Sequence, residues 1–165
     1  MPTNKYALPL DKKHIKKIIT KEAPGHIKYK DPKTGSEFDL SKCVDFICDK
    51  GTPVKAVLSG EVVRIKDSNN KTYGREYLSK DMSRMDKAGN FVIIKHANGK
   101  LSEYSHLSYK KVIVKEGQKV RTGQVIGYSG NVGLSLTPHL HFMIFRFLKP
   151  YPKRDFESLE VRWKK

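Results

Sequence analysis

The sequence predicts a mainly β fold, an antiparallel two-sheet domain with a short helical and basic arm at its N-terminus. Short segments rich in β-branched and aromatic residues recur from Cys43 onwards, at the spacing of about 8–12 residues that is typical of β-sandwich and barrel domains. Glycine, proline and asparagine separate these segments, as they do at turns. No long helical periodicity occurs after residue 25. These observations favour antiparallel strands over helices.

The composition indicates one folded domain with an excess of positive charge. The chain has 165 residues, of which 38% are hydrophobic and 30% charged, and this is enough to bury a core. Lysine and arginine total 33 against 17 acidic residues, so the net charge is +16. Such a charge favours contact with anionic polymers. The lysines are scattered and often stand beside acids, so nucleic-acid binding is not expected to be the main function.

The N-terminus and the cysteines bear on the compartment. Residues 1–22 lack the apolar core of a secretory signal, and no apolar run approaches the ~18 residues of a membrane span. We therefore expect no transmembrane segment, and either a cytoplasmic protein or a trimmed mature form of an extracellular or cell-wall protein. Cys43 and Cys48 are expected on opposite faces of one strand, as free thiols rather than a disulfide.

Three regions are expected along the chain. Residues 1–30 form an N-terminal basic arm, residues 31–148 the β domain, and residues 149–165 a C-terminal tail that packs on the domain or trails from it. A modest helical pattern of isoleucines in the arm ends at Pro24-Gly25, because proline and glycine terminate helices. Residues 27–40 carry a turn signal and are expected to form a hairpin or a loop excursion.

Local composition places the strands of the β domain. Asn98-Gly99 lies between two apolar runs and is the strongest hairpin signal in the chain. The polar stretch 67–90 is long for a plain connection, and such loops often carry function. His14 and His96 are expected at the surface. Strands are expected at 42–48, 54–58, 61–66, 91–96, 101–106, 112–114 and 125–128.

A strand that begins after Pro138 carries two histidines on one face. Side chains alternate along a strand, so His139 and His141 point the same way, about 7 Å apart. Leu140 and Phe142 point to the opposite face. The pair is compatible with two surface histidines on a half-exposed strand. It is also compatible with a site in which one imidazole binds a metal and its neighbour performs acid–base chemistry.

Several motifs, taken in order, resemble those of the lysostaphin-type zinc endopeptidases over about residues 40–145. The motifs are Val44-Asp45-Phe46, Gly51-Thr52-Pro53-Val54, Gly60-Glu61-Val62-Val63, Tyr104-Ser105-His106-Leu107, Gly123-Gln124-Val125-Ile126-Gly127-Tyr128-Ser129-Gly130 and Pro138-His139-Leu140-His141-Phe142. The resemblance implies a metallopeptidase that uses zinc to cut peptide bonds of bacterial cell-wall peptidoglycan, or of a similar peptide rich in small residues.

The resemblance also implies a role for each matched side chain. Asp45 and His141 would be zinc ligands, because zinc binds carboxylate and imidazole groups. His106 and His139 would lie beside the metal, orient or deprotonate the attacking water and stabilise the oxyanion. The substrate groove would be walled by residues 67–90, 107–111 and 129–137. Tyr104 would lie either in this cleft or in the core.

One position departs from the family pattern. Ser41 occupies the place where these enzymes normally carry a further zinc-binding histidine, and catalytic zinc sites usually have three protein ligands. His26, returned to the site by the 27–40 segment, or Cys43 could supply the third ligand. Alternatively, zinc binds weakly through two ligands. A third alternative is a degenerate, metal-poor relative that binds wall peptide or a protein partner without cleavage.

A carrier-domain hypothesis rests on a second resemblance. The segment from Val114 to Gly127 resembles the second half of a biotinyl or lipoyl carrier domain, and Asp86-Lys87-Ala88 matches the tripeptide that carries the modified lysine. Lys87 would then be the attachment site. A carrier explains neither of the two histidine motifs, so the zinc endopeptidase is the primary hypothesis.

Overall fold

β-Strands make up nearly all the regular structure of the chain. The computed structural model describes residues 5–21, 23, 25–32, 34–74, 89–149 and 155–165, and in these ranges the only helical element is a 3-10 turn, η1 (Lys12–His14). The strands are β1 (Lys5–Tyr6), β2 (Lys17–Ile19), β3 (Lys28–Lys30), β4 (Glu37–Asp39), β5 (Val44–Ile47), β6 (Pro53–Lys55), β7 (Gly60–Lys66), β8 (Thr72–Tyr73), β9 (Asn90–His96), β10 (Leu101–Val112), β11 (Lys119–Val120), β12 (Val125–Ser129), β13 (Gly133–Leu134), β14 (His139–Phe147), β15 (Phe156–Leu159) and β16 (Arg162–Trp163). The predicted mainly β class is confirmed.

Most strands belong to one branched sheet of twelve strands, and β1–β16 and β8–β13 form two small parallel pairs. The branching occurs at the two longest strands. The first half of β10 lies between β9 and β14, and its second half turns to pair with β12. Along β14, the first residues pair with β5 and the later ones with β15. Apart from the β4–β15 pair, the pairing in this sheet is antiparallel, as predicted.

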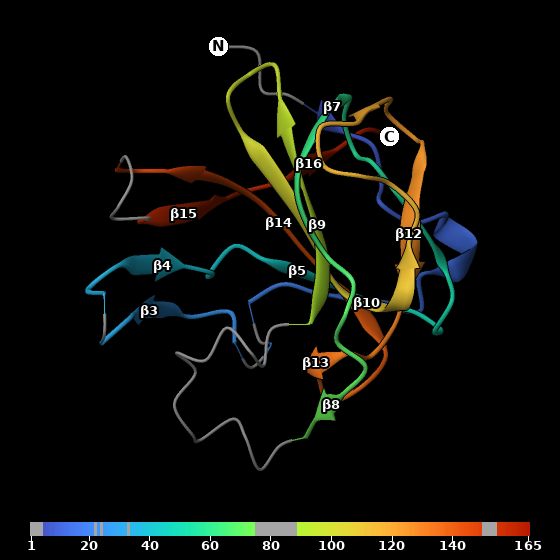
Figure 1. Cartoon of the computed structure of the whole chain (residues 1–165), viewed down its shortest axis with the longest axis horizontal. Helices are drawn as coiled ribbons and strands as arrows, with labels where there is room; N and C mark the ends of the chain where they lie inside the picture. The colour runs from blue at the N-terminus through green and yellow to red at the C-terminus, as the bar shows by residue number, and fades with distance from the viewer. Residues whose placement is uncertain (1–4, 22, 24, 33, 75–88, 150–154) are drawn as a thin grey trace.

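The core fills the space between two parts of this sheet. In Figure 1, β12 stands on one side and β9 and β14 on the other, and β10 runs from β9 across to β12. Buried side chains from both parts meet there in one apolar cluster, as the fully buried Ile126 and Phe142 illustrate. Side chains alternate along β14, so Leu140, Phe142 and Ile144 are buried on the face towards this cluster. The opposite face carries His139 and His141, followed by Met143 and Phe145 in a second, smaller apolar cluster.

The predicted N-terminal helix is wrong for the residues that the structure describes. Ile18 and Ile19 lie in β2, which pairs antiparallel with β5. β-Branched residues favour strands, and an isolated helix of this length would be marginal, whereas the edge of β5 offers hydrogen-bonding partners. Two side chains of this N-terminal segment, Tyr6 and Leu10, are buried in the core.

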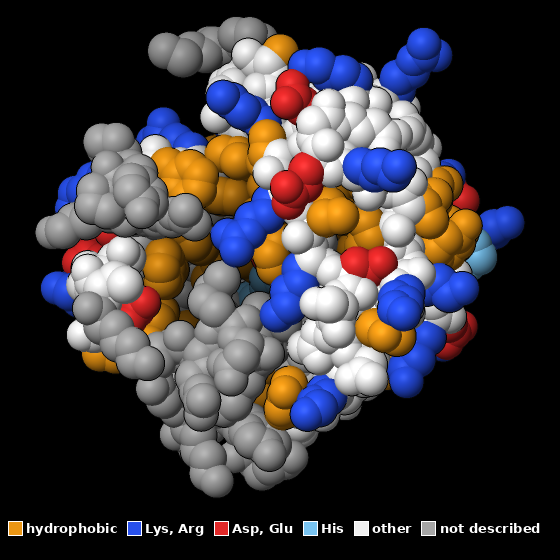
Figure 2. All heavy atoms as spheres, in the orientation of Figure 1, with side chains coloured by type: hydrophobic (Ala, Val, Ile, Leu, Met, Phe, Trp, Pro, Cys, Tyr) orange, Lys and Arg blue, Asp and Glu red, His pale blue; other side chains and the backbone are white. Residues whose placement is uncertain are grey.

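Other local predictions fare better. Residues 28–39 form the β3–β4 hairpin, and Asn98-Gly99 joins β9 to β10 with Gly99 at φ 77°. Both cysteines are free and buried, and they belong to apolar clusters on different sides of the sheet. Lysine and arginine side chains are spread over the face in Figure 2 rather than gathered in one patch. In the described ranges, no helix has the length and apolar character needed to cross a membrane.

His96 is buried, so the prediction of a surface position is wrong. Its side chain belongs to a polar network inside the core, with Nδ1 3.0 Å from the Ser59 carbonyl oxygen and Nε2 2.9 Å from Ser102 Oγ. Ser102 Oγ in turn lies 3.1 Å from the hydroxyl of Tyr104, which accepts a hydrogen bond from the Val57 amide. Tyr104 therefore packs in the core and not in the cleft.

Burial lowers the pKa of His96, although its contact with the Ser59 carbonyl opposes the shift. As the pH falls below about 6.5, the unfolded chain binds a proton that the folded protein excludes, so stability falls by up to about 1.4 kcal/mol per pH unit. We expect wild type to lose more stability on acidification than His96→Gln, measured by urea unfolding at neutral and mildly acid pH. Identical losses in the two proteins would contradict this role of His96.

Candidate metal centre and active site

Strand register brings the first two candidate ligands together. Across the antiparallel β5–β14 pair, His141 is directly opposite Asp45. Their side chains point to the face away from the core, where His141 Nδ1 lies 2.8 Å from Asp45 Oδ1. His139 is two residues earlier on the same face, and its Nε2 is 3.7 Å from the same carboxylate oxygen. The predicted shared orientation of the two histidines is therefore confirmed.

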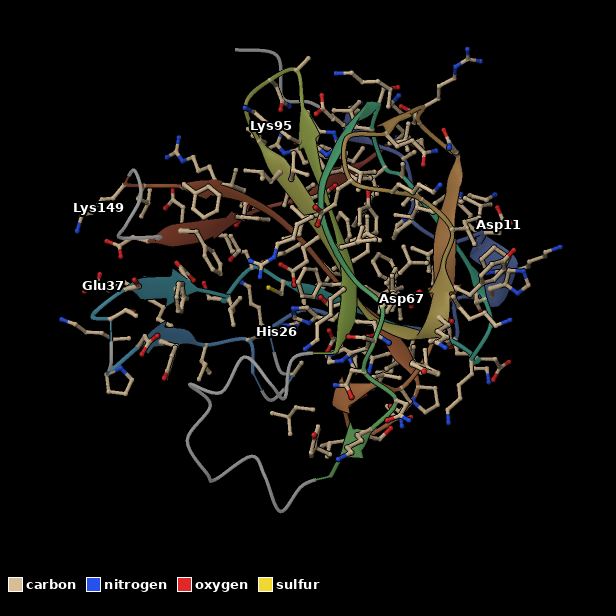
Figure 3. The ribbon with its side chains drawn as sticks, viewed as in Figure 1. Asp11, His26, Glu37, Asp67, Lys95 and Lys149 are labelled. Atoms are coloured by element: carbon tan, nitrogen blue, oxygen red, sulfur yellow. The ribbon has the colours of Figure 1, made fainter. Side chains whose placement is uncertain are left out.

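His26 completes a set of three donors. It lies between β2 and β3, and its Nε2 is 3.2 Å from Asp45 Oδ1. One ligand atom from each of His26, Asp45 and His141 lies within 4.8 Å of the others, and this is the only such group among the described residues. His26 is buried, and Figure 3 shows it below the position of β5 in the same view. His26 therefore takes the position of the third zinc ligand, for which the hydroxyl of Ser41 is a poor substitute.

The two other positions considered for the third ligand do not join this group. Ser41 donates a hydrogen bond from its hydroxyl to Asp39 Oδ1, at 2.6 Å, and so serves the local turn. Cys43 is fully buried and contacts the His141 ring, but its sulfur is not part of the converging group of donors. The geometry therefore favours His26 over Cys43 as the third ligand.

The proton positions in this cluster fit a cation. His26 Nδ1 contacts the backbone carbonyl of Thr20, and because a carbonyl only accepts, Nδ1 must carry a proton. Nε2 is then the nitrogen that faces Asp45 Oδ1 across 3.2 Å. Since the carboxylate only accepts, this contact requires a positive charge between the two atoms, which a proton on Nε2 or a bound metal ion supplies. A carbonyl partner on the outer nitrogen is also the usual support of a metal-binding histidine.

The electrostatics point the same way. Burial alone would raise the pKa of Asp45, but its hydrogen bonds with His141 and His26 outweigh burial and lower the pKa. Burial would lower the pKa of His141, but its contacts with Cys43 and Asp45 raise the pKa well above the usual value. The site thus holds an ionised carboxylate and attracts positive charge. A divalent cation bound by one carboxylate and two imidazoles is typical of catalytic zinc sites.

His106 reaches the site through a β-bulge. Ser105 is opposite His141 in the sheet, so simple alternation would turn His106 towards the core. The register with β9 shifts between Ser105 and Leu107, and His106 adopts a φ of 64°, which only a minority of residues other than glycine adopt. As a result, the ring lies on the site face, with its centroid 4.7 Å from that of His139.

Close backbone approach supports the bulge. A Cβ atom added at Gly89 would lie 2.3 Å from the Val132 carbonyl oxygen and 3.0 Å from His106 Nδ1. Only glycine avoids both clashes. The Val132 oxygen is in turn 2.8 Å from His106 Nδ1. Gly89 thus allows the backbone immediately before β9 to approach His106 closely.

Both histidines beside the triad are held neutral. Burial, together with the neighbouring His139 and His141, lowers the pKa of His106 to about 3. Burial also lowers the pKa of His139, although Asp45 opposes the shift. His106 Nδ1 faces the Val132 carbonyl and His139 Nδ1 faces the Thr137 carbonyl at 2.7 Å. Each ring must therefore protonate Nδ1, and each leaves Nε2 free to accept a proton.

Part of the predicted groove surrounds this site. Figure 2 shows a hollow in the middle of the molecule with a histidine side chain at its floor and apolar side chains along one wall. β8 pairs with β13, so residues 72–73 lie beside the glycine-rich loop that leads to His139. Most of the predicted wall 67–90, with Lys87, lies outside the described residues.

Sequence reasoning missed the supports of the site. The carbonyls of Thr20, Val132 and Thr137 orient three histidines, but a backbone carbonyl leaves no trace in the side-chain pattern. Ser135, whose Oγ is 3.1 Å from His139 Nδ1, was also missed. The sequence feature that could have indicated this role is the position of Ser135, four residues before His139 in a glycine-rich loop.

Known proteins resemble this chain in sequence and in structure. Residues 39–151 match the family described as Peptidase family M23. The chain is 42% identical over 98 residues to the peptidoglycan DD-endopeptidase ShyA of Vibrio cholerae serotype O1, covering 59% of this chain and 18% of that protein. It is 41% identical over 100 residues to lysostaphin of Staphylococcus simulans, covering 60% and 17%. A zinc-containing peptidase from Vibrio cholerae superposes with a TM-score of 0.57 at 28% identity, covering 86% of this chain and 36% of that one.

Fold, donor set and relatives agree on one class, the mainly β metallopeptidases. Within this class, the chain belongs to peptidase family M23, whose members are hydrolases. The chain spans less than a fifth of the length of the two curated relatives named above. His26 lies outside the residues 39–151 that match the family, so the triad is completed by a segment beyond the family match. Membership of this family argues against the carrier hypothesis.

Proposed function

We propose that this domain is a zinc-dependent endopeptidase that cleaves peptide bonds of cell-wall peptidoglycan or of a similar peptide rich in small residues. The observation that carries the proposal is the buried convergence of His26, Asp45 and His141 beside two neutral histidines. In the proposal, His26, Asp45 and His141 hold the zinc, and His106 and His139 are the catalytic residues. Peptidoglycan as the substrate class follows from the names of the relatives.

The residues of the chain suffice for a hydrolytic cycle. Zinc, when bound, supplies Lewis-acid activation of water and of the scissile carbonyl. His139, with its unprotonated Nε2 directed towards Asp45, accepts the proton of the attacking water. A protonated ring can then donate that proton to the leaving amine. His106, with its centroid 5.9 Å from that of His141, lies on the other side of the site, and its unprotonated Nε2 accepts a hydrogen bond from the attacking water and so orients it.

The positive charge of the chain fits a wall substrate. A net charge of +16 attracts anionic polymers, and bacterial walls combine peptide cross-links with acidic polymers. We infer that this charge raises the local concentration of substrate rather than selecting the bond. Weaker cleavage at high salt, with the same cleavage products, is the corresponding behaviour.

Digestion of purified peptidoglycan tests the function. We expect the zinc-loaded protein to release new amino termini, a chelator to stop the release, and added zinc to restore it. A protein that binds zinc and peptidoglycan but releases no amino termini would contradict the enzyme proposal. That result would establish the alternative of a domain that binds wall peptide or a protein partner without cleavage.

Zinc binding is also expected to stabilise strand β2. β2 contains no buried residue, and His26 is tied to the carbonyl of Thr20, directly after β2. A metal bond to His26 therefore anchors a strand that is otherwise weakly held. Hydrogen exchange of the β2 amides is expected to slow about 10-fold or more on zinc addition. His26→Ala should abolish this effect, and equal β2 exchange with and without bound zinc would contradict it.

A further inference from the structure

One short loop orients both histidines that flank the triad. The loop comprises residues 131–137, between β12 and β14. Its Val132 carbonyl accepts from His106 Nδ1, and its Thr137 carbonyl accepts from His139 Nδ1. Since carbonyl groups cannot donate, the loop fixes the proton of both rings on Nδ1. The loop thereby decides which nitrogen of each ring is available for chemistry.

Ser135 is the side chain at the centre of this loop. It is 5% exposed, and its Oγ lies 2.6 Å from Asn131 Oδ1, 2.9 Å from the Thr137 carbonyl oxygen and 3.1 Å from His139 Nδ1. A hydroxyl has one proton to donate and two lone pairs. Donation to the nearest oxygen, Asn131 Oδ1, leaves a lone pair of Ser135 directed at the protonated Nδ1 of His139. The hydroxyl thus links the start of the loop to the histidine.

The loop itself is fastened on its outer side. The backbone amide of Ser135 donates to the Tyr73 carbonyl at 3.2 Å, and the hydroxyl of Thr72 donates to the Asn131 carbonyl. These contacts, with the β8–β13 pairing, hold Ser135 in place from a different part of the chain. Ser135 is therefore pre-positioned and does not depend on His139 for its own orientation.

We propose that Ser135 is a positioning residue for catalysis, acting through His139. Its hydroxyl is a second acceptor for His139 Nδ1–H beside the Thr137 carbonyl and restrains the ring, so that Nε2 stays directed towards Asp45, 3.7 Å away. The inference rests on the proposed hydrolytic function, in which His139 Nε2 accepts a proton. Loss of such an outer partner of a site histidine typically lowers activity about 10- to 100-fold.

Ser135→Ala tests the proposal, with Ser135→Thr as the variant that keeps the hydroxyl. Ser59→Ala is the matched control, because Ser59 bonds the exposed Thr122 far from the site. With zinc-loaded proteins, we expect Ser135→Ala to lower kcat about 10- to 100-fold, with little change in KM or zinc content. Ser135→Thr and Ser59→Ala should stay near the wild-type kcat. A merely structural serine would instead affect zinc content or folding.

Imidazole nitrogen NMR provides a readout independent of activity. In the wild type, we expect the His139 signals of a ring protonated at Nδ1, and in Ser135→Ala a clear change of these signals with those of His96 unchanged. Unaltered His139 signals or a wild-type kcat in Ser135→Ala would overturn the proposal. If the wild type proves inactive, the proposed function fails, and the NMR comparison still decides whether Ser135 is a hydrogen-bond partner that orients the His139 ring.

Discussion

His141→Ala is expected to abolish peptidase activity, by about 10³-fold or more, because it removes one of the three proposed zinc ligands. Asp45 would lose the partner at 2.8 Å that helps to keep it ionised, and His26 and His139 would remain beside the carboxylate. Asp45→Asn tests the same centre differently, since it keeps the shape of the side chain but removes its charge. Both variants should lose zinc, measured by metal analysis after dialysis.

The control for these variants is His14→Ala, which removes a histidine from the 3-10 turn away from the site. It should retain both zinc and activity. Activity that survives in His141→Ala would contradict the assignment of the centre. Lost activity with full zinc content would place His141 in catalysis instead of metal binding.

Phe142→Ala is expected to be the most destabilising single substitution, at about 3–5 kcal/mol. Phe142 is fully buried on the strand that carries His139 and His141, and its ring lies 5.2 Å from Tyr104, 6.4 Å from Phe46 and 5.6 Å from Trp163, measured between centroids. Removal of the ring leaves a cavity among large, rigid neighbours. A loss of this size is a large part of the stability of an ordinary domain. Urea unfolding measures it directly.

Phe147→Ala is the matched control, on the same strand but 49% exposed. It should cost less than about 1 kcal/mol. Equal costs for the two substitutions would contradict the placement of Phe142 in the main apolar cluster and of Phe147 at the exposed end of β14.

Local rules predicted the parts of the site that lie within one strand. The alternation of side chains placed His139 and His141 on a common face of β14, with Leu140 and Phe142 in the core. The Asn98-Gly99 hairpin followed from the backbone preference of its turn. In each case the deciding interaction is between neighbours in sequence, so the sequence carries the information.

The same rule fails at His106. Alternation alone would send His106 to the core, and only the bulge with its positive φ turns it to the site. The resemblance to a known family supplied this residue, not the strand pattern. The buried His96 shows the complementary error, because a polar residue is accepted in the core when distant Ser59 and Ser102 satisfy it.

The third donor depends on contacts between distant segments. His26 reaches Asp45 because β2 pairs with β5 and the chain returns after Thr20, and neither event follows from local propensity. The spacing of the isoleucines before His26 predicted a helix, whereas Ile18 and Ile19 lie in strand β2. Sequence reasoning could name His26 as a candidate, but only the tertiary structure distinguishes it from Cys43.

Zinc content of the purified protein tests the central claim most directly. After incubation with zinc and removal of the excess, the wild type is predicted to hold about one ion per chain, as expected of a three-ligand site. Cys43→Ser should hold the same amount, and His26→Ala should lose most of it. A wild type without zinc, or a His26→Ala protein with the full complement, would contradict the proposed His26–Asp45–His141 centre.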